Sequence, residues 1–362
     1  MLETQKKKID DDIKIIIDYV LDATREKVLS IILYGSYGRD EGAFYADQKG
    51  VIHTYNDYDL ILVVDDYIES IKLNQIAHSL EEKLDVKWID ISQKKKSKLK
   101  NLKLTIFNYD LKYGSRIIYG EKEILNNVPK FKNNEISLKE VETLYFTRIW
   151  AFLGSLTHDG FKRKLNRNES RFFRYQMAKA ILAVVDVLLL QQGKYQTSYR
   201  KRVQIINEIY NKDSNIVKWS NWAISEKCNP RDDVMSINEL KEMYINIASF
   251  FVQEMYIGLA IYYKREIKSA LDIENALLRS GSDWFVFIKT VVKTRSLSHL
   301  KRTKIKLAQA YLLDFFIMEG ADKARSKEKV INLLKGFDAS INKNNFDWHK
   351  LRLMVSQLRM KI

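Results

Sequence analysis

The spacing of hydrophobic residues changes character about one third of the way along the chain. In the first part, apolar residues form short runs between polar turns, and only residues 4–28 and 70–84 show the three- or four-residue spacing of an amphipathic helix. Short apolar runs predict strands at 30–34 (SIILY), 57–66 (DYDLILVVDD) and 86–92 (VKWIDIS). RIIYG at 116–120 predicts an edge strand or an extended loop. We expect a mixed α/β region with a small sheet.

From about residue 136, long segments with helical spacing follow one another and strand-like alternation is absent. These segments are VETLYFTRIWAFLGSL, FFRYQMAKAILAVVDVLLLQQ, KRVQIINEIY, LKEMYINIASFFVQEMYIGLAIYYKREI, DWFVFIKTVVKT and KIKLAQAYLLDFFIME. The predicted fold class is therefore α+β, with a small mixed-sheet domain over 1–126 and a helical bundle domain over 136–362. A loop at 225–233 (SEKCNPRDD) offers a further division of the helical part.

The composition limits the classes of protein that fit the sequence, but it does not identify a binding partner. The 362 residues carry a net charge of +15, which attracts polyanions such as nucleotides or RNA, but a genome biased toward A/T codons gives the same Lys- and Asn-rich composition. The single cysteine, Cys228, excludes an internal disulfide framework and suits a reducing cytoplasm. The longest apolar run, 180–190, is too short to span a bilayer and predicts a buried helix. We expect a cytoplasmic protein with no membrane partner.

The candidate chemistry lies between the first two predicted strands. GSYGRDEG at 35–42 holds three of the chain's 13 glycines, which indicates either a tight turn or a loop that approaches a phosphate closely. Asp57 and Asp59 then begin the next strand, where alternation places both carboxylates on one face, about 7 Å apart at the Cα atoms. Such a pair of carboxylates is typical of Mg²⁺ sites that also bind substrate phosphates. Either signal alone is weak, and together they favour a nucleotide site.

These residues resemble the signature of the DNA polymerase beta nucleotidyltransferase superfamily. The pattern is Tyr34-Gly35-Ser36, a spacer, and Asp57-Tyr58-Asp59-Leu60, and GSYGRDEG is similar to the GS-x-x-RGE form of bacterial members. The match covers roughly residues 25–125, and its spacer is longer than usual, with an insertion around FYADQKGVIHTY. The resemblance implies that Gly35, Ser36 and Arg39 contact the nucleotide, although Arg39 is more often a local structural clamp.

A third carboxylate on a neighbouring strand is also implied by the resemblance. Asp90, flanked by Ile89 and Ile91, is preferred over Asp85, which follows a predicted helix. Asp57, Asp59 and Asp90 would then bind two Mg²⁺ ions, with Mn²⁺ as an alternative, and an NTP such as ATP. The implied reaction transfers a nucleoside monophosphate to an acceptor hydroxyl and releases pyrophosphate.

Further contacts are implied in the helical half. Similar enzymes use a lysine on a long apolar helix and a Ser-Tyr segment after it to hold the triphosphate, which carries over to Lys179, Ser198 and Tyr199. For Lys179, a surface lysine that lays its stem along apolar neighbours explains the sequence equally well. The tryptophans, Trp88, Trp150 and Trp284 among them, are expected in the core.

The acceptor stays open at the level of sequence. RNA or tRNA, a partner protein or a small molecule are all compatible with this active site, as is synthesis of a nucleotide second messenger in antiviral signalling. A hypothesis of a different class is a catalytically silent, antitoxin-like nucleotide-binding module, against which the presence of both Asp57 and Asp59 argues. The oligomeric state has no signal in the sequence.

Overall fold

The structure is a computed structural model that describes residues 3–25, 27–47, 49–279, 298–337 and 347–360. The described chain is an α+β protein with two compact units. Unit 1 contains Met1–Ser137 and Leu189–Arg231, and unit 2 contains Leu138–Leu188 and Asp232–Ile362. Each unit is described by itself. The expected boundaries at 126 and 136 stay predictions.

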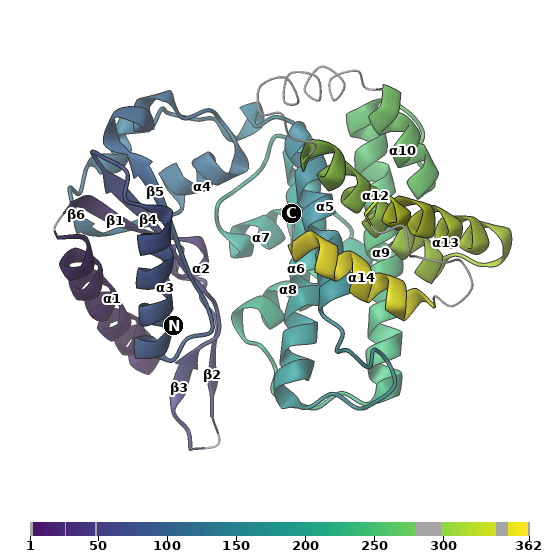
Figure 1. The fold of residues 1–362 in the computed structure, drawn as a ribbon, viewed down its shortest axis with the longest axis horizontal. Helices are drawn as coiled ribbons and strands as arrows, with labels where there is room; N and C mark the ends of the chain where they lie inside the picture. Colours follow the sequence, from purple (N-terminus) through teal and green to yellow (C-terminus); the bar gives the residue numbers. More distant parts are fainter. Residues whose placement is uncertain (1–2, 26, 48, 280–297, 338–346, 361–362) are drawn as a thin grey trace. The chain divides into compact units, whose positions relative to one another are not determined.

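Unit 1 is built on a four-stranded mixed sheet with the strand order β5-β4-β1-β6 (Figure 1). Strand β1 (Val28–Tyr34) pairs antiparallel with β4 (Tyr58–Val64) and with β6 (Arg116–Gly120), while β5 (Ile89–Lys95) pairs parallel with β4. The three expected strands are present, and 116–120, expected as an edge strand or an extended loop, forms the edge strand β6. The first helix, α1 (Glu3–Thr24), ends four residues earlier than expected, and Arg25 adopts a left-handed conformation (φ 52°) before the sheet begins.

The two faces of the sheet pack on different elements. Residues such as Leu33, Tyr58, Leu60 and Ile89 face α1 and α3 (Ser70–Leu84), which lie side by side on that face (Figure 1). On the other face, cluster residues come from β1, β4, α4 (Ile106–Tyr113) and the short 3₁₀ helices η1 (Lys96–Asn101) and η2 (Ile124–Asn127). Alternation along β4 puts Asp57 and Asp59 on this second face, with Ile61 and Val63.

The insertion between the glycine loop and the paired acids forms a separate β-hairpin. Strand β2 (Phe44–Ala46) pairs antiparallel with β3 (Ile52–Thr54). At its base, the Tyr55 amide donates to the Ala43 carbonyl at 2.9 Å, which closes the hairpin. The long spacer therefore projects as a hairpin, and its two ends return to one place beside the sheet.

Unit 1 also contains two helices from the second half of the chain, α7 (Tyr199–Ile209) and α8 (Asn215–Cys228), which pack on each other. The expected loop at 225–233 is wrong in its first four residues, since Ser225–Cys228 complete α8 and the loop begins at Asn229. Glu226 and Lys227 are buried, and this packing extends the helix through a segment whose polar residues suggest a loop.

Unit 2 is helical throughout its described residues. It contains α5 (Lys139–Gly154), most of α6 (Arg167–Gln191), α9 (Ile237–Tyr263), α10 (Ala270–Arg279), α12 (Ser298–Ile317), α13 (Gly320–Lys335) and α14 (Trp348–Met360) (Figure 1). The helix expected from DWFVFIKTVVKT, with Trp284, lies outside the described residues. α12 packs on α13, α14 and α5, and the interior of the unit is rich in Leu, Val and aromatic side chains.

One helix of the described chain, α9, is long and apolar enough to cross a membrane by length and composition. Half of its most apolar window is buried inside the protein, as in the core helix of a soluble protein. A single helix of this kind is weak evidence for a membrane segment.

Candidate functional site

Three acidic residues are brought to one end of the sheet. Asp59 on β4 is the register partner of Asp90 on the parallel strand β5, and Asp57 immediately precedes β4. Ile89 and Tyr58 point into the core on the opposite face, so Asp57, Asp59 and Asp90 share the second face. Asp85, the other candidate, ends α3 in a left-handed conformation with its side chain 92% exposed. Of the two, Asp90 is the one that lies beside the paired acids in the sheet.

The glycine loop lies directly against this acidic end. Gly35 follows β1 with φ +70°, and a Cβ atom built on it would lie 2.0 Å from Oδ2 of Asp59. Any side chain here would displace the carboxylate and would strain a left-handed backbone. Tyr34 is the register partner of Asp59, so strand pairing brings the Gly-Ser turn and the carboxylate together. Glycine is therefore required where the turn meets the acid.

Two residues outside the predicted set fix the spacing between the loop and the acids. The buried Tyr37 hydroxyl donates to the Ala43 carbonyl at 2.9 Å and accepts from the Asn56 amide at 3.2 Å. The Asn56 side chain accepts from the Ala43 amide at 2.7 Å. Since Asn56 immediately precedes Asp57, these bonds hold the start of β4 beside the glycine loop. The sequence signal was faint, because Tyr37 and Asn56 resemble ordinary turn residues.

Ser36 already has a cationic partner. The ammonium of Lys227, near the end of α8, donates to the Ser36 hydroxyl at 2.8 Å, although the residues are 191 positions apart. Lys227 is 1% exposed, and burying an ammonium is costly unless it is paired and hydrogen bonded. A buried positive charge at the Gly-Ser turn is a suitable contact for a phosphate oxygen. Sequence inspection missed Lys227 because it stands among polar residues at an expected loop.

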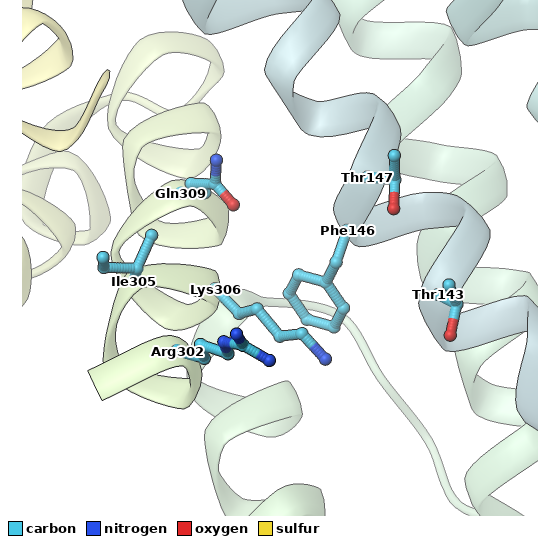
Figure 2. A pocket seen from close by; sticks show the side chains of 7 residues that line it. All are labelled: Thr143, Phe146, Thr147, Arg302, Ile305, Lys306 and Gln309. Atoms are coloured by element: carbon cyan, nitrogen blue, oxygen red, sulfur yellow. The ribbon is translucent and has the colours of Figure 1, made fainter. Parts of the chain in front are cut away.

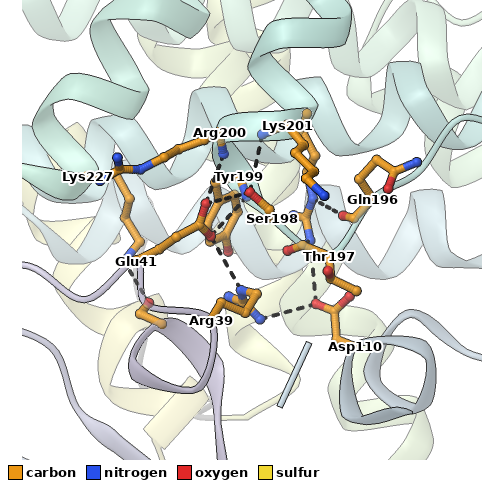
Figure 3. Close-up of polar contacts among 12 residues, drawn as sticks. Arg39, Glu41, Asp110, Gln196, Thr197, Ser198, Tyr199, Arg200, Lys201 and Lys227 are labelled. Carbon is orange, nitrogen blue, oxygen red and sulfur yellow. Dashed lines mark hydrogen bonds and ion pairs between the residues drawn. The ribbon is translucent and has the colours of Figure 1, made fainter. Parts of the chain in front are cut away.

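Glu41 joins the glycine loop to the start of α7, as Figure 3 shows. Its buried carboxylate accepts from the Ser198 hydroxyl at 2.8 Å and from the amides of Tyr199 and Arg200 at 3.0 Å each. Ser198 is the N-cap of α7, and its hydroxyl also accepts from the Lys201 amide. A carboxylate here satisfies free helical amides and complements the positive end of the helix dipole. Ser198 therefore has a structural role in holding the loop.

Arg39 belongs to the same buried network. Its guanidinium donates to Oδ2 of Asp110 at 3.4 Å and stacks on the Tyr199 ring at 5.1 Å. Arg202, 1% exposed, approaches the same Asp110 oxygen at 3.4 Å and the Tyr199 ring at 4.5 Å. Burial lowers the pKa of Arg39, but Tyr199 and Asp110 outweigh it, so the net pKa lies above the ordinary value and Arg39 stays charged. Arg39 and Tyr199 thus clamp α7 to the loop.

Lys179 lies on α6 in unit 2, half-buried, with its ammonium 4.9 Å from the Tyr175 ring. The sheet end with the three carboxylates is in unit 1. Cys228, also in unit 1, has a pKa raised by burial despite the nearby Arg200, which does not favour a nucleophilic thiolate.

The donor set is chemically suited to Mg²⁺, but the side chains are not gathered into a cage. Within the described residues, no group of three or more His, Cys, Asp or Glu side chains is placed to hold a metal ion. Mg²⁺ typically uses one or two carboxylates together with substrate phosphates and water rather than a complete protein cage. The Asp59 carboxylate lies against the Gly35 turn. A carboxylate beside such a turn is chemically compatible with an ion that arrives with a bound phosphate.

Neither of two cavities in the described chain has Asp57, Asp59 or Asp90 in its lining. In unit 2, an open groove of about 340 Å³ between α5 and α12 is lined by Thr143, Phe146, Thr147, Arg302, Ile305, Lys306 and Gln309 (Figure 2). Its Lys306 pairs with Glu142 at 3.1 Å. In unit 1, a cavity of about 410 Å³ is lined by Lys6, Ile9, Asp10, Asp40 and Arg116. The groove in unit 2 has no carboxylate in its lining, so it lacks the ligands that metal-dependent phosphoryl chemistry needs.

No protein-family model, curated protein or solved structure matches the chain. What the sheet end can do is therefore argued from its own residues. It combines three carboxylates on one face, a tight turn in contact with one of them, and a buried ammonium on the serine of that turn.

Proposed function

We propose that the chain is a metal-dependent nucleotidyltransferase of the DNA polymerase beta type, which transfers a nucleoside monophosphate from an NTP to an acceptor hydroxyl. The observation that carries the proposal is the contact of the Gly35 turn with the Asp59 carboxylate, 2.0 Å from a Cβ position on the glycine. A turn that binds phosphate and a carboxylate that binds its counter-ion must be neighbours in such an enzyme. The resemblance of residues 25–125, which rests on the same Gly-Ser turn and paired acids, is in keeping with the proposal.

Each group then has a defined task. Gly35, Ser36 and the Lys227 ammonium hold the phosphates, and Asp57 and Asp59 hold Mg²⁺. When bound, the ions neutralise charge on the phosphates and lower the pKa of the acceptor hydroxyl. The acceptor oxygen attacks the α-phosphorus, the bond to the bridging oxygen breaks, and pyrophosphate leaves toward the turn. Asp90 takes the hydroxyl proton. The proposed location is the cytoplasm.

Two observations favour a second candidate, a silent nucleotide-binding module. The Ser36 hydroxyl is bonded to Lys227, and the described carboxylates do not converge into a metal cage. In an antitoxin-like partner of this kind, the Lys227 bond would be a permanent structural contact. The two candidates differ in whether the bound nucleotide reacts.

The test is incubation of the purified protein with α-labelled NTPs, Mg²⁺ and either total RNA, cell lysate or NTP alone. We expect label transfer by the wild type and none by Asp57→Asn or Asp59→Asn at unchanged thermal stability. Label on RNA, on protein or in a small product identifies the acceptor. Transfer by either variant at the wild-type rate contradicts the proposal, and NTP binding without transfer to any acceptor supports the silent module.

A further inference from the structure

The only tryptophan of the described chain among its exposed large hydrophobic residues lies beside the proposed carboxylate site. Trp88 is 62% exposed, although a core position is expected for it. It directly precedes β5, and its carbonyl accepts from the Tyr58 amide at 3.4 Å, which holds it level with Asp57. An exposed indole at a fixed place in the sheet offers a flat aromatic face on which a planar ligand can stack.

The register of the sheet determines which way this side chain projects. Ile89 is 3% exposed and packs in the core with Tyr58, so its neighbours Trp88 and Asp90 project from the opposite face. That is the face of Asp57 and Asp59. No ring contact joins Trp88 to another side chain among the residues that the structure describes. The indole is therefore available on the carboxylate face, at an edge strand of the sheet.

The strand order places Trp88 on the acceptor side of the proposed reaction. The Gly35 turn ends β1, on one side of β4, and β5 lies on the other side. In phosphoryl transfer the attacking and leaving oxygens are roughly in line. Since pyrophosphate leaves toward the turn, the acceptor approaches from β5, where Asp90 and Trp88 lie.

We infer that Trp88 is the stacking platform for the acceptor, and that the acceptor hydroxyl belongs to a nucleotide. Aromatic side chains stack on nucleobases of any sequence, and a nucleobase is the planar group that a hydroxyl-bearing nucleotide offers. The nucleotide comes either from the 3′ end of an RNA strand or from a free nucleotide, as in second-messenger synthesis. This inference rests on the proposed function, because the direction of approach follows from it.

The experiment combines direct binding with steady-state transfer for Trp88→Ala, Trp88→Phe and a control, Tyr67→Ala. Tyr67 is 60% exposed and follows the opposite end of β4, so it matches Trp88 in exposure but lies far along the strand. Binding is measured by fluorescence anisotropy with a labelled single-stranded RNA, and by competition with AMP. Transfer gives separate KM values for the acceptor and for the NTP.

For Trp88→Ala we expect about a 5- to 100-fold loss of acceptor affinity and an equal rise in acceptor KM, with the KM of the NTP unchanged. Trp88→Phe restores most of the affinity, and Tyr67→Ala equals the wild type. Loss confined to RNA assigns the acceptor to an RNA end, and loss shared by AMP assigns it to free nucleotides. Wild-type binding and transfer by Trp88→Ala overturn the inference and leave the proposed function standing. Lost binding by Trp88→Ala in a protein that transfers no label with any NTP overturns the proposed function, and Trp88 is then a nucleotide-stacking residue outside a transfer reaction.

Discussion

Two sets of charged side chains in unit 1 differ in how their charges are satisfied. Glu41, Asp110 and Arg202 are buried, the Arg39 side chain is 7% exposed, and each has an opposite charge or helix amides as partners. Asp57 and Asp90 are at least partly exposed and have no hydrogen-bond or ion-pair partner within the described chain. Carboxylates that face solvent without a protein partner are open to a ligand or cation.

This difference separates the residues that hold the fold together from those that can react with a substrate. The buried network attaches α7 to the glycine loop and orients the turn, whereas the carboxylate end faces solvent and can meet a substrate. Arg39, Ser198 and Tyr199, which the resemblance assigns to nucleotide binding, belong by their contacts to the buried network. Loss of a residue from the first set should lower stability, and loss from the second should lower activity alone.

The largest expected effect is on activity at the carboxylate end. Asp59→Asn removes a charge that the proposed reaction needs to hold its cation, while the amide preserves the shape against Gly35. We expect a loss of at least about a thousandfold in kcat/KM, which is about 4 kcal/mol of transition-state stabilisation. The measurement pairs label transfer with a thermal unfolding curve. A variant that loses activity only because its unfolding midpoint drops would assign Asp59 to the network instead.

The largest expected effect on stability lies in the buried network. Asp110→Ala leaves Arg39 and Arg202 without their shared carboxylate, and removing one partner of a buried ion pair costs about 3–5 kcal/mol. Urea unfolding followed by circular dichroism measures the loss. Asp66→Ala is the control, because Asp66 pairs with Lys95 at 2.8 Å in an exposed position, and its unfolding midpoint should not change. Equal midpoints for the two variants would show that the network does not hold α7.

Much of unit 1 could be predicted because its signals are local. Short apolar runs rich in β-branched residues indicate β1, β4, β5 and β6, and the hydrophobic spacing at 70–84 predicts α3 with its observed bounds. The position of Asp90 beside Asp59 follows from which strands are neighbours, and the resemblance supplied that neighbour relation.

The rest depends on contacts across long stretches of chain. Nothing near Lys227 indicates that it bonds to Ser36, and the acidic Glu41 gives no sign that its partners are the amides of α7. Trp88 was expected in the core because tryptophan is usually buried, but its place just before an edge strand exposes it. Pairings of this kind depend on tertiary packing, and a single sequence has no periodicity that reports them.

The same comparison applies in unit 2, where Asp314 is a buried acid with no cationic partner among the described residues. Asp314, 1% exposed, accepts from the Tyr256 hydroxyl and from the Ala270 amide at 2.7 Å, and burial raises its pKa to about 6. Because the folded-state pKa lies above the unfolded value, this group's stabilising contribution is full at low pH and is lost as pH rises through about 6. Relative to Asp314→Asn, the wild type should lose about 2 kcal/mol of unfolding free energy between pH 4.5 and 7. Urea titrations at both pH values test this, and parallel curves for the two proteins would contradict it.

The smallest expected effect decides between the two roles of Ser198. Ser198 is the N-cap of α7, so Ser198→Ala should lower the unfolding free energy by about 1 kcal/mol and leave the KM of the NTP unchanged. Ser214→Ala is the matched control, since Ser214 precedes α8 without a side-chain cap bond and should matter less. Chemical denaturation and transfer kinetics on the same two variants supply the comparison. A tenfold rise in the NTP KM at unchanged stability would instead mean that the Ser198 hydroxyl touches the triphosphate, and the start of α7 would then belong to the reacting set.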